Sequence, residues 1–164
     1  MSFLVIGKDE VMAAWCAAQI PHVGAGGFGP SKAIGVAVEH TSGPRLIAAC
    51  VYHNYIAAYG ICEISFAALS PKWATKPNIR SLLAVPFAQY KVRKVYLQIP
   101  ADNARALRFC AGIGFKREAV LRHHYAAGRH GVVMSMMRDE WAQTWRMGRA
   151  RPEWRARSEQ KEAA

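Results

Sequence analysis

The chain lacks a cysteine pair with C-x-x-C spacing, and none of its histidines stands at ligand spacing from a cysteine. Zinc sites and disulfide frameworks in small proteins are built from closely spaced, patterned cysteines. The cysteines present are scattered, which argues against a metal site and against a disulfide framework and suits a reducing cytoplasm. They are Cys16, Cys50, Cys62 and Cys110.

Long apolar runs are also missing. The first ten residues, MSFLVIGKDE, have no basic start, and their apolar run is too short for a secretory signal peptide. No uninterrupted apolar run approaches the roughly 20 residues that a membrane-spanning helix needs. We therefore expect a soluble protein.

Acidic residues are scarce. The chain has 11 Asp and Glu against 22 Lys and Arg, which gives a formal net charge of +11. Such an excess favours polyanionic partners, either nucleic acid or a phosphorylated cofactor, although many small basic proteins bind neither. The 164 residues suit one domain, which we place at residues 1–145, because no linker divides them. Residues 146–164 are rich in Arg, Glu, Ala and Pro and are predicted to form a basic helix or a disordered tail.

The first half of the chain predicts a strand, a helix and three further strands. Residues 2–6 are strand-like, and Asp9 opens a helix that ends before Pro21. The spacing of its apolar residues places Val11, Met12, Trp15 and Ala18 on one inner face. Three strand-like runs follow, at residues 33–40, 46–55 and 61–69, and their polar turns predict an antiparallel meander.

Gly24 to Gly29 match the pattern G-x-G-x-x-G. In a dinucleotide-binding fold that pattern follows a strand and opens a helix. Here a predicted helix comes before the glycines, and Pro30 and a predicted strand come after them. We therefore expect a flap beside a substrate cleft and no dinucleotide site.

The second half begins with a helix predicted at residues 78–90, kinked at Pro86. Residues 94–115 then contain a strand, a break at Pro100, and a helix that Asp102 could cap. Residues 116–125 and 131–138 predict a hairpin around a loop at 126–130.

Three features of this region resemble the second half of a GNAT domain, the acetyl-CoA-dependent N-acetyltransferase superfamily. They are Asn103-x-x-Ala106, the aromatic Phe109, and the pair Gly114-Phe115. Residues 116–122 and 132–141 are similar to the closing hairpin of its phage-encoded and ribosomal-protein branches. The resemblance implies an α/β (α+β) fold, with a mixed central sheet of about six to seven strands, splayed near its middle and flanked by helices.

In GNAT proteins the fourth strand binds the pantetheine arm through its backbone edge, and the next helix holds the pyrophosphate at its N-terminus. The family's loop, [Arg/Gln]-x-x-Gly-x-[Gly/Ala], is replaced here by residues 70–80, which contain no glycine. Its cations could bind phosphate by charge, or they could form a solvated surface. The resemblance implies these cofactor-contacting candidates: Ala68, Leu69, Lys72, Trp73, Lys76, Arg80, Asn103, Phe109 and Cys110.

Two of these candidates also have a structural interpretation. Asn103 matches the family's cofactor-contacting asparagine but could instead cap the helix. Cys110 stands where many members carry a tyrosine that protonates the leaving thiolate. A thiol is a weak donor, and we favour a buried core role for it.

An acyltransferase needs a base for the amine and an acid for the leaving thiolate. Glu63 matches the position on the fourth strand where many GNAT enzymes carry a glutamate, and an unpaired buried carboxylate would be costly. His53 is the alternative base, although a structural role is also consistent. In an extended strand His123 and Tyr125 share one face while His124 takes the other, so at most part of this cluster can face the cleft. Tyr125 is our first choice of acid.

The leading hypothesis is a transferase that moves an acetyl group from acetyl-CoA to a primary amine. Because of the net charge, the amine could lie on nucleic acid or a modified base. The rival hypotheses are a non-catalytic GNAT-like binding module and a basic structural protein that forms a homodimer through the closing hairpin.

Overall fold

The structure is a computed structural model that describes residues 1–145, so the tail predicted at residues 146–164 lies outside it. Contacts divide the chain into two compact units, one from Met1 to Val95 and one that begins at Tyr96. The predicted α+β class is confirmed, with seven strands flanked by helices. The elements are β1 (Ser2–Val5), α1 (Asp9–Ala18), β2 (Lys32–Val38), β3 (Arg45–Ile56), β4 (Ile61–Ala68), α2 (Lys76–Ala84), β5 (Lys94–Pro100), α3 (Ala104–Gly112), β6 (Lys116–Ala126), β7 (Arg129–Met137) and α4 (Arg138–Trp145).

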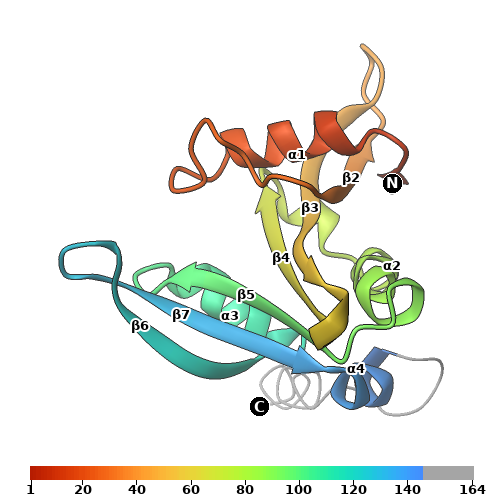
Figure 1. Ribbon diagram of the computed structural model, residues 1–164. Helices are drawn as coiled ribbons and strands as arrows, with labels where there is room; N and C mark the ends of the chain where they lie inside the picture. The colour runs from red at the N-terminus through yellow and green to blue at the C-terminus, as the bar shows by residue number, and fades with distance from the viewer. Residues whose placement is uncertain (146–164) are drawn as a thin grey trace, which may run out of the picture. The chain divides into compact units, whose positions relative to one another are not determined.

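The first unit contains the predicted meander, in which β1, β2, β3 and β4 pair in order and antiparallel (Figure 1). Helix α1 packs against β2 and β3 through Met12 and Cys16, four residues apart on one helical face. The prediction that Val11 belongs to this face is wrong, because its side chain is 60% exposed. The inner face is rotated by one residue from the predicted one.

Gly35 on β2 allows α1 to approach the sheet closely. A Cβ atom at this position would lie 2.5 Å from Sδ of Met12 and 2.6 Å from Cδ1 of Leu46. Both distances are far shorter than any carbon contact in a well-packed core. Any larger residue at position 35 would therefore force the side chains of Met12 and Leu46 to move.

Helix α2 covers the opposite face of the meander. Tyr52 points to this face and donates a hydrogen bond of 2.9 Å from its hydroxyl to the carbonyl of Leu82. Where the sequence predicted a kink at Pro86, α2 is followed by a π-helical turn at Val85–Gln89 that contains this proline. Residues from the two faces of β3 and β4 thus meet different helices.

The second unit contains β5, β7 and β6, side by side in this order, with α3 and α4. The indole Nε1 of Trp145 on α4 donates to the carbonyl of Ile113, 2.9 Å away, and so ties α4 to the end of α3. The prediction that Asp102 caps α3 is wrong. Asn103 is the cap, because its side chain accepts a hydrogen bond of 3.1 Å from the amide of Ala106.

The hairpin of β6 and β7 has a two-residue turn at residues 127–128, where the sequence predicted a loop at 126–130. Leu121 pairs with Gly131 and Ala126 with Arg129, so residues 122–125 lie opposite a single residue of β7. The backbone at His123 has a φ of 54°. This bulge breaks the strand alternation from which the sequence assigned the faces of residues 123–125.

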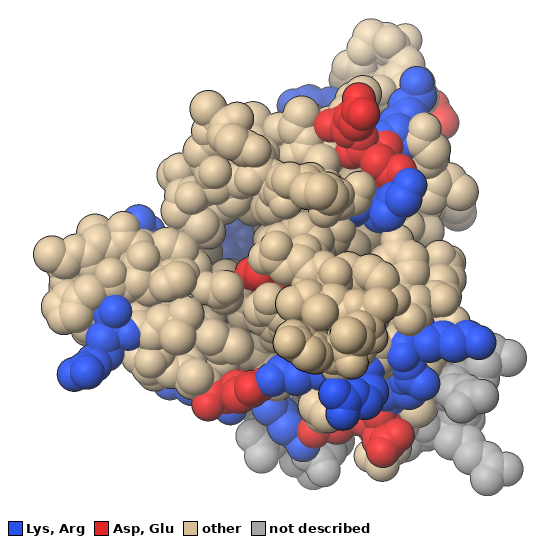
Figure 2. Space-filling view, in the orientation of Figure 1, with Lys and Arg blue, Asp and Glu red and all other residues tan. Residues whose placement is uncertain are grey.

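Lys and Arg side chains form several separate groups on the face shown in Figure 2, and acidic side chains stand beside some of them. The net charge is thus not gathered into one continuous field on that face. Among the described helices, none is long and apolar enough to cross a membrane. Within residues 1–145, no group of three or more His, Cys, Asp or Glu side chains could hold a metal ion.

Candidate functional site

Glu63 lies on β4 and is only 6% exposed. Its strand neighbours Cys62 and Ile64 point to the α2 face, so the carboxylate points to the α1 face of the meander. It accepts a hydrogen bond of 2.7 Å at Oε2 from Nδ2 of Asn54. A buried carboxylate is costly without polar partners, and this contact offsets part of that cost.

His53 lies directly opposite Glu63 in the pairing of β3 with β4. Its Nε2 is 3.0 Å from the hydroxyl of Ser65, and its ring lies 4.9 Å from that of Phe28, centroid to centroid. Burial lowers the pKa of His53, and the nearby charge of Glu63 opposes that shift. The imidazole is therefore favoured as a neutral ring, able to accept a proton.

The loop before α2 uses its backbone amides internally. Thr75 caps the helix by accepting from the amide of Asn78, 3.3 Å from Oγ1, and Ser70 accepts from the amide of Lys72. The amides of residues 74, 75 and 79 also donate to carbonyls of this loop. Pro77 is the second residue of α2 and has no amide hydrogen. These loop amides are therefore already engaged by partners within the loop.

Cationic side chains surround the start of α2 instead. Lys72, Lys76 and Arg80 are all exposed, so their charges are available to a phosphate group. Trp73, also a predicted cofactor contact, is 7% exposed and packs on Phe66 with 5.7 Å between ring centroids. The indole therefore has a core role in this loop.

The end of β4 is exposed at Ala68 and Leu69, and the amide of Leu69 donates 2.8 Å to the carbonyl of Ile47. On α3, Phe109 is half-buried and Cys110 is 4% exposed. Burial raises the pKa of Cys110 to about 12. Such a thiol is a poor proton donor to a thiolate with an ordinary pKa of about 8.5, which supports the core role.

Tyr125, the candidate acid, lies at the bulge of β6. Its ring stands 4.8 Å from that of His124, and the guanidinium of Arg129 lies 5.8 Å from the ring centroid. His123 and His130 both use Nδ1 as an acceptor within the hairpin. His130 Nδ1 accepts from the amide of His123, 2.9 Å away, and His123 Nδ1 accepts from the amide of Gly128, 2.8 Å away. Both rings are used to hold the bulge and the turn.

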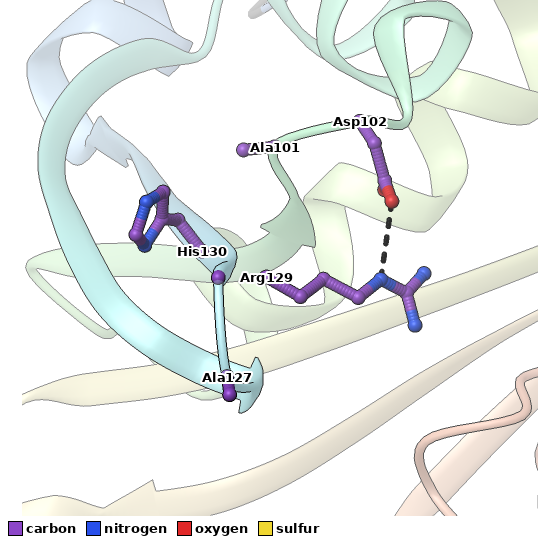
Figure 3. Close-up of a pocket in the computed structure, with 6 residues that line it drawn as sticks. Ala101, Asp102, Ala127, Arg129 and His130 are labelled. Atoms are coloured by element: carbon purple, nitrogen blue, oxygen red, sulfur yellow. Dashed lines mark hydrogen bonds and ion pairs between the residues drawn. The ribbon is translucent and has the colours of Figure 1, made fainter.

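An open cleft of about 620 Å³ lies beside this turn (Figure 3). The side chain of Arg129 reaches across to Asp102, with Nε 3.1 Å from Oδ2, while that of His130 points away from the pair. The cleft is lined by Ala101, Asp102, Ala127, Gly128, Arg129 and His130. None of the catalytic candidates is among them.

Sequence reasoning missed four residues that support the candidate site. Asn54 and Ser65 bind the two candidate bases, and Phe28 from the glycine-rich loop packs on one of them. Asn78 anchors the loop before α2, because its Nδ2 donates to Ser2 and to the carbonyl of Trp73. Their positions in the sequence were the available signal, because Ser65 lies two residues after Glu63 and Asn54 directly follows His53.

No protein-family model matches the chain. An N-alpha-acetyltransferase from Sulfurisphaera tokodaii is 37% identical over 46 residues, which are 28% of this chain and 28% of that relative. Solved structures resemble a much larger share of it. Spermidine/spermine N-acetyltransferase SpeG from Vibrio cholerae matches with a TM-score of 0.61 and 13% identity, over 85% of this chain and 94% of that one.

A GCN5-related N-acetyltransferase from Brucella melitensis matches with a TM-score of 0.57 and 19% identity, over 69% of this chain and 53% of that one. The chain has the fold of the GNAT acetyltransferases. GNAT acetyltransferases use acetyl-CoA as co-substrate. The likeness to phage-encoded and ribosomal-protein members stays a prediction.

Proposed function

We propose that the chain is an N-acetyltransferase that moves an acetyl group from acetyl-CoA to a primary amine. The observation that carries this proposal is the buried polar cluster on the α1 face. There Glu63 and His53 lie opposite each other and bind Asn54 and Ser65. Ionisable groups held in a buried, hydrogen-bonded cluster are a common mark of catalytic sites.

Glu63 serves as the base in this proposal. The lone pair of the neutral amine nitrogen attacks the thioester carbonyl carbon, and Glu63 accepts the proton that this nitrogen loses. A C–N bond forms and the C–S bond breaks, and Tyr125 gives its hydroxyl proton to the leaving thiolate. His53 is the alternative base, favoured in its neutral form by burial.

The cations of the loop before α2 are proposed to bind the phosphate groups of CoA. Lys72, Lys76 and Arg80 are exposed and need no rearrangement of the backbone. Because the loop amides already donate to partners within the loop, binding would rest on charge and would weaken as salt is added.

The exposed edge at Ala68 and Leu69 is proposed to contact the pantetheine arm. In this proposal Nδ2 of Asn103 contacts the cofactor while its Oδ1 keeps the cap bond. Phe109 would contact the cofactor from α3, and Cys110 keeps its core role.

Calorimetric titration with acetyl-CoA, repeated with desulfo-CoA, tests this proposal. Saturable binding of both ligands, followed by acetyl transfer to an amine that Glu63→Gln abolishes, is expected. Binding with full retention of transfer in Glu63→Gln would remove Glu63 from the mechanism. Binding without transfer to any amine would favour the non-catalytic GNAT-like binding module.

A narrower version of the proposal places the acceptor amine on nucleic acid or a modified base. The net charge of +11 is the observation that favours it. Binding of an oligonucleotide should then weaken steeply with salt, because phosphate contacts release counterions. Undetectable or salt-insensitive binding would exclude this version. The rival hypothesis of a structural protein predicts a homodimer, and light scattering in the same buffers would measure its mass.

A further inference from the structure

We propose that Asn54 is a positioning residue that orients the carboxylate of Glu63 and stabilises its ionised form. This inference rests on the proposed function, in which Glu63 is the base. It concerns the side-chain amide of Asn54, which would act through the carboxylate of Glu63. The contact is the hydrogen bond of 2.7 Å from Nδ2 of Asn54 to Oε2 of Glu63.

A bulge in β3 brings the amide to the carboxylate. His53 pairs with Glu63 and Ile56 with Ile61, so residues 54 and 55 lie opposite Cys62 alone. An extra residue in one strand redirects the side chains around it. In an unbroken strand Asn54 would point to the face opposite that of its neighbour His53, and the two would not both meet Glu63.

Asn54 adopts a left-handed backbone conformation, with φ of 45°. Residues other than glycine rarely adopt this backbone conformation, and asparagine is one of those that adopt it most readily. Glycine would fit the bulge with less strain but would bring no donor. The residue present therefore combines a tolerated left-handed backbone with an amide directed at the base.

The surroundings of Glu63 make this donor effective. Glu63 is 6% exposed whereas Asn54 is exposed, so the amide reaches inward from the surface to a buried carboxylate. His53 on β3 and Cys62 on β4 are titratable groups that interact electrostatically with Glu63. Hydrogen bonds to a charged group in a buried site are stronger than those between neutral groups.

Two variants distinguish the effect of the Asn54 side-chain amide from the effect of its left-handed backbone conformation. Asn54→Gly keeps the left-handed conformation and removes the donor. We expect kcat to fall roughly tenfold or more, with the Kd for acetyl-CoA unchanged and the unfolding midpoint near that of the wild type. Asn54→Asp keeps the shape but places a second carboxylate beside Glu63. The acidic limb of the rate–pH profile should then move to higher pH, because like charges disfavour ionisation.

Lys91→Gly is the matched control. Lys91 is an exposed residue that also has a left-handed backbone, with φ of 54°, and it lies outside the polar cluster. Its replacement by glycine should change neither kcat nor the pH profile. If Asn54→Gly behaves like this control, the inference is overturned.

An NMR measurement that needs no substrate tests the same contact. The 13C carboxyl signal of Glu63, assigned by its loss in Glu63→Gln, should change its chemical shift in Asn54→Gly, because Oε2 loses its hydrogen bond to Nδ2 of residue 54. An unchanged signal would overturn the inference whether or not the protein transfers acetyl groups. A changed signal in a protein without transfer activity would uphold the contact and count against the proposed function alone.

Discussion

The ring of Phe28 packs against the imidazole of His53, with 4.9 Å between the ring centroids. This contact joins the glycine-rich loop between α1 and β2 to the polar cluster on β3 and β4. The loop is therefore part of the wall of the candidate site. Its G-x-G-x-x-G pattern follows a helix and precedes a strand, as the sequence analysis expected, which is not the arrangement of a dinucleotide site.

Removing this ring should change the titration of His53. Burial lowers the pKa of His53 from its ordinary 6.5, so Phe28→Ala, which admits water, should raise it. The contribution of neutral His53 to stability is present above pH 6.5 and is lost as the pH falls toward the lowered pKa. Phe28→Ala should therefore reduce that acid loss. NMR titration of the His53 ring measures the shift, and Tyr59→Ala, at an exposed tyrosine, is the control. A midpoint that falls or stays constant would contradict the prediction.

The affinity for acetyl-CoA should depend on the cations at the start of α2. Replacing Lys72, Lys76 and Arg80 together by alanine should weaken binding about tenfold or more at low salt, and the difference should shrink as salt is added. Calorimetry at two ionic strengths measures both effects. Lys91→Ala removes an exposed cation elsewhere in the first unit, and it should bind acetyl-CoA as the wild type does. Equal affinities for the triple variant and this control would exclude the cationic loop.

All four cysteines should react slowly with thiol reagents in the folded protein. Each is buried, and burial raises the pKa of Cys16 and Cys110 to about 12 and that of Cys62 to about 11. The thiolate is the reactive form, and little of it exists at pH 8. Ellman's reagent should detect few thiols in native buffer and four in guanidinium chloride. Rapid labelling of Cys110 in the folded protein would contradict the core role assigned to it.

Asn78 should matter for stability more than its polar character suggests. It is 6% exposed, and its Nδ2 donates 3.0 Å to the hydroxyl of Ser2 and 2.9 Å to the carbonyl of Trp73. Asn78→Ala removes both bonds and should lower the free energy of unfolding by about 1–3 kcal/mol. Urea denaturation measures this loss. Ser81→Ala, at an exposed position on the same helix, should change stability by less than about 0.5 kcal/mol.

The sequence predicted the elements well where apolar periodicity decides the structure. The meander, the helix with its irregular turn at Pro86, and the order of the elements follow from local patterns. The inner face of α1 was misplaced by one residue. Val11 and Met12 are both apolar, so periodicity alone could not choose between them, and the choice is made by the space that Gly35 leaves for Met12.

The candidate site was less predictable because it depends on bulges. Glu63 and His53 could be named from their strands, but Asn54 joins them only through an extra residue in β3. The bulge in β6 likewise overturned the strand alternation assumed for His123 to Tyr125. Bulges arise from pairing between distant segments, and a single strand's sequence gives little sign of them. The choice between Asp102 and Asn103 as helix cap was open for a simpler reason, since both residue types cap helices well.

The packing at Gly35 limits which sequences this meander can accept. A saturation library at position 35 should retain glycine almost alone after selection for folded protein, since even alanine would press on Met12 and Leu46. Enlarging residue 35 would require a smaller residue at position 12 or 46 in the same clone. Chimaeras that exchange α1 with a protein of the same fold should therefore carry β2 along with the helix.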